Sequence, residues 1–201
     1  MPRLPELVVE TLTPDQRRVH DAIVAGPRGA VVGPLRVWLT SPELADRAQA
    51  LGAFCRFNTS LPPRLSELAL LVVGAFWRAG FEWHAHHPIG VKAGLDPADL
   101  EAIRVGREPR FARADEAAVF AFSRELLHER RVSPATYRRA VDLLGERAVV
   151  DLVGVLGYYG LVCMTIVAFE LPLPAGATPP FPDSADADPG PGSTVAAPRR
   201  P

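Results

Sequence analysis

The sequence predicts an all-α fold of about six to eight helices. Apolar residues recur at helical spacing along most of the chain, and no stretch alternates apolar and polar residues as a half-buried strand would. Proline at the first helical position loses no hydrogen bond, because that N–H has no partner within the helix. Four segments pair such a proline with a preceding residue that commonly caps helices: Thr13-Pro14, Ser41-Pro42, Asp96-Pro97 and Ser133-Pro134.

The expected helices follow one another with short connections. Thr13 to Gln16 has the spacing of a capping box, which opens the first helix. The segment from Gly26 to Thr40 contains two Gly-Pro pairs, so we expect it to be the longest irregular connection. The predicted helices cover residues 14–25, 42–57, 64–79, 81–93, 97–105, 114–130, 134–144 and 146–169.

The last predicted helix is apolar enough to require a membrane test. Leu152 to Phe169 carries no charge and reaches the length of a spanning helix. Three glycines at i, i+3 spacing (Gly154, Gly157 and Gly160) suit close packing between helices. We therefore expect a buried core or subunit-interface helix and not a membrane span.

Composition and charge exclude several classes of partner. The chain has 201 residues, 48% hydrophobic and 22% charged, with a net charge of -1. This is ordinary globular composition, with no electrostatic case for binding nucleic acid or an anionic membrane. The two cysteines, Cys55 and Cys163, form neither a disulfide framework nor a metal-ribbon spacing, and the N-terminus lacks a secretory signal pattern. We expect a cytoplasmic protein.

The proline distribution divides the chain into two parts. Residues 1–174 are expected to form the helical domain. Residues 175–201 are rich in proline and small residues and have almost no large apolar side chains. Such a segment cannot bury enough surface to offset its ordering entropy, so we expect a disordered tail.

Candidate functional residues gather near the middle of the chain. Glu82 and His86 are i, i+4 on a helix, about 40° apart, so the carboxylate can orient the imidazole in a general acid–base pair. An ordinary helix ion pair has the same spacing. His84 and His87 project to another side, and a metal there would need a further ligand from elsewhere, so no metal site is predicted.

Glu67 lies in the first turn of a helix that is otherwise apolar. A carboxylate there can simply stabilise the helix N-terminus. If it instead faces Glu82 and His86, two carboxylates and an imidazole converge, an arrangement that separates acid from base roles.

Glu67 opens a buried helix, His86 follows nineteen residues later, and an Ala93-Gly94-Leu95 turn precedes an acidic helix start. In this pattern the chain resembles the carboxymuconolactone decarboxylase family, which shares its fold with alkyl hydroperoxidase D-like (AhpD-like) proteins. The likeness covers most of residues 30–174. It extends to Ser41-Pro42-Glu43-Leu44-Ala45, Leu61-Pro62-Pro63-Arg64 and Phe169-Glu170-Leu171-Pro172-Leu173-Pro174.

The redox members of that family carry a Cys-x-x-Cys pair whose second cysteine lies four residues before the histidine. Here the two positions are Ala79 and Glu82. A chain without a thiolate there cannot run thiol–disulfide exchange at these positions. The resemblance therefore implies the non-redox branch, which works without a cofactor on a small carboxylated lactone or β-keto acid.

The resemblance implies roles for individual residues. His86 would be the proton donor, Glu82 its orienting partner and Glu67 a second carboxylate that tunes the site. The pocket would hold a small-molecule substrate. Candidate substrate-binding residues are Trp83, His84, His87, Trp38, Arg56 and Arg64, of which the arginines suit a substrate carboxylate.

Other functions remain open on the sequence. They are a thiol peroxidase or reductase, a related lyase or isomerase, a non-catalytic ligand-binding protein of the same fold, and a metal-dependent enzyme that uses His84 and His87. The resemblance also implies a homo-oligomer, a trimer or hexamer of helical protomers.

Overall fold

The computed structural model describes residues 3–5 and 7–181, and this part of the chain is all-helical, as the sequence predicts. A short 3-10 turn, Val9–Thr11, precedes the first helix, and a single π-helical turn, η2 (Glu125–Glu129), continues α7. The α-helices are α1 (Pro14–Ala25), α2 (Pro34–Trp38), α3 (Pro42–Phe57), α4 (Pro63–Phe76), α5 (Gly80–Lys92), α6 (Pro97–Arg104), α7 (Ala114–Arg124), α8 (Pro134–Leu144) and α9 (Glu146–Ala168).

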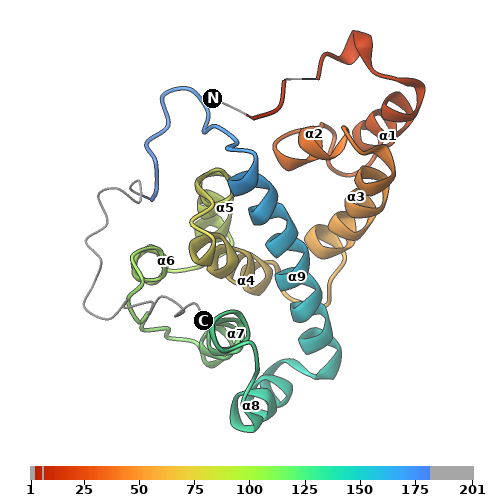
Figure 1. The fold of residues 1–201 in the computed structure, drawn as a ribbon. Helices are drawn as coiled ribbons and strands as arrows, with labels where there is room; N and C mark the ends of the chain where they lie inside the picture. Colours follow the sequence, from red (N-terminus) through yellow and green to blue (C-terminus); the bar gives the residue numbers. More distant parts are fainter. Residues whose placement is uncertain (1–2, 6, 182–201) are drawn as a thin grey trace, which may run out of the picture.

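Helix α9 runs through the middle of the molecule, with α1, α2 and α3 on one side and α4 and α5 on the other (Figure 1). Helix α4 packs against α5, α7 and α9, which makes it the second central element. Both helices are rich in fully buried aliphatic side chains, such as Leu68 and Leu71 on α4 and Leu152 and Val155 on α9. The active-site candidates on α4 and α5 therefore lie beside the core.

Helix α9 is long and apolar enough to cross a membrane, but 61% of its most apolar window is buried inside the protein. Its buried residues face α3 and α4. A core helix of a globular protein has this pattern, so the packing agrees with the expected core position.

The helix starts follow the predicted capping design at three of the four places. Thr13 forms a full capping box with Gln16, Asp96 accepts a hydrogen bond from the Ala98 N–H, and Ser133 accepts one from the Thr136 N–H. Ser41 occupies the N-cap position of α3, but its side chain makes no capping bond. Sequence spacing alone therefore identified the start of α3 but not its interactions.

The connection between α4 and α5, residues 77–79, is longer than predicted, because α4 ends at Phe76. Arg78 adopts a left-handed backbone conformation with φ of 51°. Its N–H donates to the Ala75 carbonyl, and the Ala79 N–H donates to the Gly74 carbonyl, which is the Schellman pattern of helix termination. This tight turn brings α5 back against α4.

The segment from Gly26 to Thr40 is not wholly irregular. It contains the five-residue helix α2, which begins at Pro34. Leu35 and Trp38 are buried and anchor α2 against the core. Tertiary burial, and not local helical periodicity, stabilises so short a helix.

Residues 175–181, which the sequence assigns to the tail, contact the helical domain. Phe181 is buried and packs edge-on against Trp83 on α5, with ring centroids 5.6 Å apart. The Arg104 side chain donates to the Pro180 carbonyl. The remainder of the predicted tail, residues 182–201, lies outside the described residues.

Candidate functional site

Glu67, Glu82 and His86 converge into one cluster between α4 and α5. The Nδ1 atom of His86 lies 2.8 Å from Oε2 of Glu67, and its Nε2 atom lies 3.3 Å from Oε1 of Glu82. Both ring nitrogens therefore contact carboxylates. The imidazole bridges one acidic residue from each helix.

Close packing of the two helices produces this contact. Gly90, one turn after His86 on α5, faces α4, and a Cβ added there would lie 3.0 Å from Leu71 Cδ1 and 3.8 Å from Glu67 Cβ. A side chain at position 90 would crowd the ends of the Leu71 and Leu95 side chains. Glycine at this position therefore fits the close packing of α4 and α5.

The three side chains of the cluster are largely buried. His86 is 3% exposed and Glu82 4%, while the side chain of Glu67 is 12% exposed. Burial raises the pKa of Glu82, and the negative charge of Glu67 raises it further, against the opposing charges of His86, Arg56 and Arg28. Glu82 therefore holds a proton more readily than an ordinary glutamate does.

Aromatic residues of α9 form a wall of the site. Tyr159 packs edge-on against His86 with ring centroids 5.8 Å apart, and Tyr158 packs against Tyr159 at 5.1 Å. Trp38 continues the row against Tyr158 at 6.1 Å, and its indole N–H donates to Thr165 at 2.9 Å. Burial raises the pKa of both tyrosines, so both stay neutral phenols near pH 7.

Sequence reasoning named Trp38 but missed both tyrosines. They lie in the uncharged stretch of α9, where an aromatic residue gives no signal that separates a site wall from ordinary core. Only the contact of Tyr159 with His86, and that of Tyr158 with Tyr159, show their position.

Three of the predicted pocket residues on α5 do not face the cluster. Trp83 is buried but packs against Phe181 and lies 5.8 Å from the His87 ring. His84 is exposed. The helical phase explains this, since Glu82 and His86 share a face that positions 83, 84 and 87 do not.

The two predicted carboxylate-binding arginines also have other contacts. Arg64 is bridged to Asp115, at 2.7 Å, and to Glu116, both at the start of α7. Arg56 is exposed, and its guanidinium lies 5.5 Å from the centre of the Phe57 ring. Of the two, only Arg56 contributes a charge that acts on Glu82.

Both cysteines are free and buried. Burial raises the pKa of Cys55 to about 11 and raises that of Cys163 as well. Thiols of this kind are protonated near neutral pH and make poor nucleophiles. Neither cysteine occupies the positions of the redox pair, Ala79 and Glu82.

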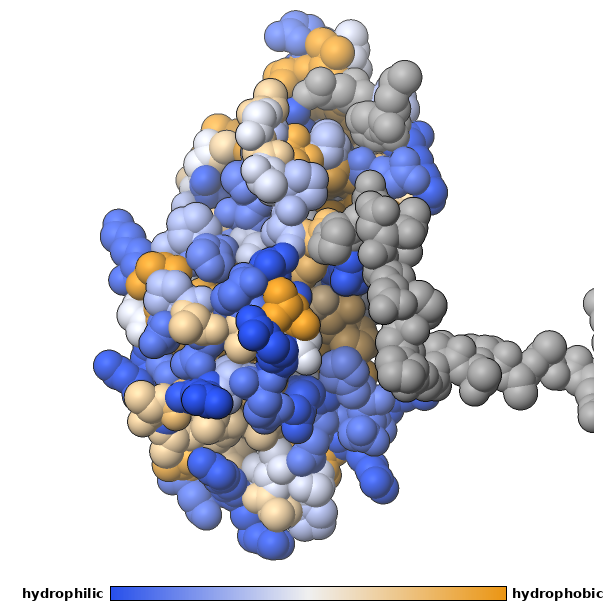
Figure 2. Space-filling view, turned by 90° about the vertical axis from the view of Figure 1, so that its left-hand side faces the viewer, coloured by the Kyte–Doolittle hydropathy of each residue, from blue (hydrophilic) through white to orange (hydrophobic). Residues whose placement is uncertain are grey.

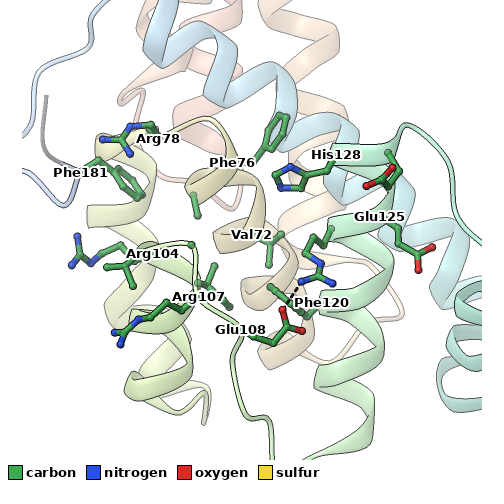
Figure 3. A pocket seen from close by; sticks show the side chains of 16 residues that line it. Val72, Phe76, Arg78, Arg104, Arg107, Glu108, Phe120, Glu125, His128 and Phe181 are labelled. Atoms are coloured by element: carbon green, nitrogen blue, oxygen red, sulfur yellow. Dashed lines mark hydrogen bonds and ion pairs between the residues drawn. The ribbon is translucent and has the colours of Figure 1, made fainter. Parts of the chain in front are cut away.

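A groove of about 800 Å³ lies elsewhere, between the C-terminal part of α4, the end of α6, α7 and η2. Figure 3 shows Phe76 beside His128 at one side of it, with Val72 and Phe120 deeper inside. None of Glu67, Glu82 and His86 lines this groove. The acid–base cluster and the groove are therefore separate features.

No protein-family model and no curated protein matches the chain. Several solved structures do match, and two of them follow. An uncharacterized peroxidase-related protein from Silicibacter sp. TM1040 superposes with a TM-score of 0.68 at 14% identity, over 87% of this chain and 92% of the other. A protein of unknown function from Agrobacterium tumefaciens, with a suggested assignment as the antioxidant defence protein AhpD, gives 0.62 at 16% identity, over 71% and 99%.

The chain has an AhpD-like fold. The two superpositions show the fold alone, because both identities are low. Within this fold, Glu67, Glu82 and His86 converge next to the core. The chemistry has to be argued from them.

Proposed function

We propose that this AhpD-like protein is a cofactor-free acid–base enzyme that decarboxylates a small carboxylated lactone or β-keto acid. The observation that carries the proposal is the buried imidazole of His86 held between two carboxylates. Because the three groups are buried, the protonation state of each depends strongly on the charges of the other two. Active sites assign acid and base roles in this way.

The proposed reaction breaks the bond between the carboxylate carbon and the adjacent carbon of the substrate. CO₂ leaves, and the electron pair moves into the neighbouring carbonyl as an enolate. His86 then donates the proton from Nε2 to the carbon that carried the carboxylate, while Glu67 accepts a hydrogen bond from Nδ1. The 3.3 Å contact of Nε2 is longer than the 2.8 Å contact of Nδ1, so Nε2 is the nitrogen freer to turn to a substrate.

Glu82 then donates a proton to His86 in this scheme, which restores the proton donor. Its raised pKa lets it carry a proton, and the next proton comes from water. This assignment differs from the sequence-based one, in which Glu82 orients the imidazole. The shorter contact supports an orienting role for Glu67.

Thiol chemistry is the main alternative, since one structural neighbour is described as peroxidase-related. It needs an accessible thiolate near the imidazole. Burial and the raised pKa of Cys55 work against this, as do Ala79 and Glu82 at the redox positions. These observations favour acid–base chemistry.

The test is a pH–rate profile of CO₂ release from a panel of carboxylated lactones and β-keto acids. His86→Ala should lower turnover by about 10²- to 10⁴-fold, the usual contribution of a general acid. Glu82→Gln should lower turnover less and change the pH profile. A Cys55→Ala, Cys163→Ala double variant is the control and should keep full activity.

Two results would contradict the proposal. Release of no CO₂ from any substrate of the panel would leave a related lyase, isomerase or ligand-binding role. Loss of turnover in the cysteine variant, with its fold intact, would support thiol chemistry.

A further inference from the structure

The groove between α4, α6, α7 and η2 has an apolar floor. Val72, Ile103 and Phe120 line it although each of these side chains is largely buried, and Phe76, which is 38% exposed, lies at one side. The volume of about 800 Å³ lies within the range of sites that bind small molecules. Apolar surface at the bottom of such a groove favours a ligand with an apolar body.

The side of the groove formed by η2 departs from regular helix geometry. This π-helical turn contributes three lining residues, Glu125, His128 and Glu129. The His128 ring packs edge-on against Phe76, with ring centroids 4.9 Å apart. Single π-helical turns are rare and occur frequently at functional sites, so η2 favours a binding role for the groove.

The charged residues of the groove are divided between its two sides. Figure 3 shows Arg78, Arg104 and Arg107 on the side of α6, and Glu125 and His128 on the side of η2. A negative group is therefore attracted to the α6 side, and the carboxylate of Glu125 disfavours it on the η2 side. An amphipathic anion fits this arrangement in one orientation, with its acid group towards α6 and its apolar body over the floor.

Arg107 is available to bind the acid group of such a ligand. Arg104 pairs with Glu101, and Arg124 pairs with Glu108. The guanidinium of Arg107 is exposed and makes no hydrogen bond or ion pair with the described part of the chain. A carboxylate can bind a guanidinium through two parallel N–H groups.

We propose that this groove is a binding site for amphipathic monoanions, namely carboxylates with a medium-length apolar chain. Arg107 binds the carboxylate, and Val72, Phe76 and Phe120 contact the apolar chain. The site does not depend on the proposed decarboxylation, because none of the residues that line the groove belongs to the acid–base cluster.

The test measures binding of octanoate to the full chain by isothermal titration calorimetry. Octanol is its neutral counterpart, and acetate has the carboxylate without the chain. Each buried methylene raises the affinity about fourfold, so wild type should bind octanoate at least tenfold more tightly than acetate. It should also bind octanoate at least fivefold more tightly than octanol, because only the carboxylate pairs with a guanidinium.

A matched pair of arginine variants locates the acid group. Arg107→Met should lose the preference for octanoate over octanol and keep the affinity for octanol. Arg110→Met is the control, since Arg110 is exposed on the same connection between α6 and α7 but does not line the groove. This variant should keep the preference.

A second pair of variants locates the apolar chain. Phe76→Ala should weaken the binding of octanoate and octanol at least threefold each. Phe57→Ala removes a phenylalanine that is 46% exposed on α3 and lies outside the groove, so it should change neither affinity. A native circular dichroism spectrum of each variant excludes a folding defect.

Three results would overturn the proposal. The first is a wild-type protein that does not prefer octanoate over octanol, and the second is an equal effect of Arg107→Met and Arg110→Met on that preference. The third is binding of octanoate only by a chain that ends at Phe181, which would make residues 182–201 the occupant of the groove in the full chain.

Discussion

At the scale of single residues, the cluster was partly predictable. The i, i+4 spacing of Glu82 and His86 predicts their contact, and Glu67 meets them as the conditional prediction required. The partners from α9 and from the α1–α2 connection were not predictable. Arg28 donates a hydrogen bond to the Tyr158 hydroxyl from 130 positions away, and no local pattern links residues at that separation.

The raised pKa of Glu82 predicts a pH dependence of stability. Because the folded state binds this proton more tightly than the unfolded state does, the contribution of Glu82 to the free energy of unfolding is greatest below the ordinary pKa of 4.5 and falls as the pH rises towards the folded pKa. Glu82→Gln removes this decline. In urea denaturation at pH 4.5, 6 and 7.5, the free energy of unfolding of the variant should rise relative to that of wild type as the pH rises.

Glu43→Gln is the control for that measurement. Glu43 is exposed on α3 and pairs with Arg47, so its substitution should change stability equally at all three pH values. Parallel curves for wild type and Glu82→Gln would mean that Glu82 has no raised pKa.

At the scale of helices, the sequence predicted the starts better than the ends. Capping residues and prolines are local signals, and they placed the starts of α1, α3, α6 and α8 correctly. The end of α4 depends on Arg78 in a left-handed conformation, for which arginine has no local preference. Helix α2 depends on burial of Trp38, which only the assembled fold provides.

The capping interactions give a matched pair of variants. Thr13→Ala removes the capping box of α1 and should lower the free energy of unfolding by about 1 kcal/mol. Ser41→Ala removes a residue that makes no capping bond and should change it by less than about 0.5 kcal/mol. Equal losses in chemical denaturation would show that Ser41 caps α3 in solution.

At the scale of the whole molecule, the surface is uneven. The face in Figure 2, where it is not covered by grey atoms, is mostly hydrophilic with separate hydrophobic spots. Helix α9, in contrast, carries a row of exposed apolar side chains at helical spacing, of which Val150 is 70% exposed. The row consists of Val150, Val153, Met164 and Val167, with Leu51 and Phe54 exposed on the adjoining α3.

We propose that this row is the contact between copies of the chain, as the expected homo-oligomer requires. Exposed apolar side chains gathered on one side of a helix are typical of protein interfaces. The double variant Val150→Glu, Val153→Glu should shift the protein to a smaller species in size-exclusion chromatography with light scattering. Val24→Glu, at an exposed position on α1, is the control and should leave the size unchanged.

A wild-type protein that elutes as a monomer at all concentrations would contradict this proposal. So would a shift of the same size in both variants.

The burial of the two cysteines has a consequence for measuring motion. Cys55 is on α3 and Cys163 on α9, the helices whose contact encloses Tyr158. A buried, protonated thiol reacts with an alkylating reagent only when its surroundings open, so its labelling rate reports how often that part of the protein opens. If Cys55 is labelled faster than global unfolding permits, α3 detaches while the rest of the fold stays intact.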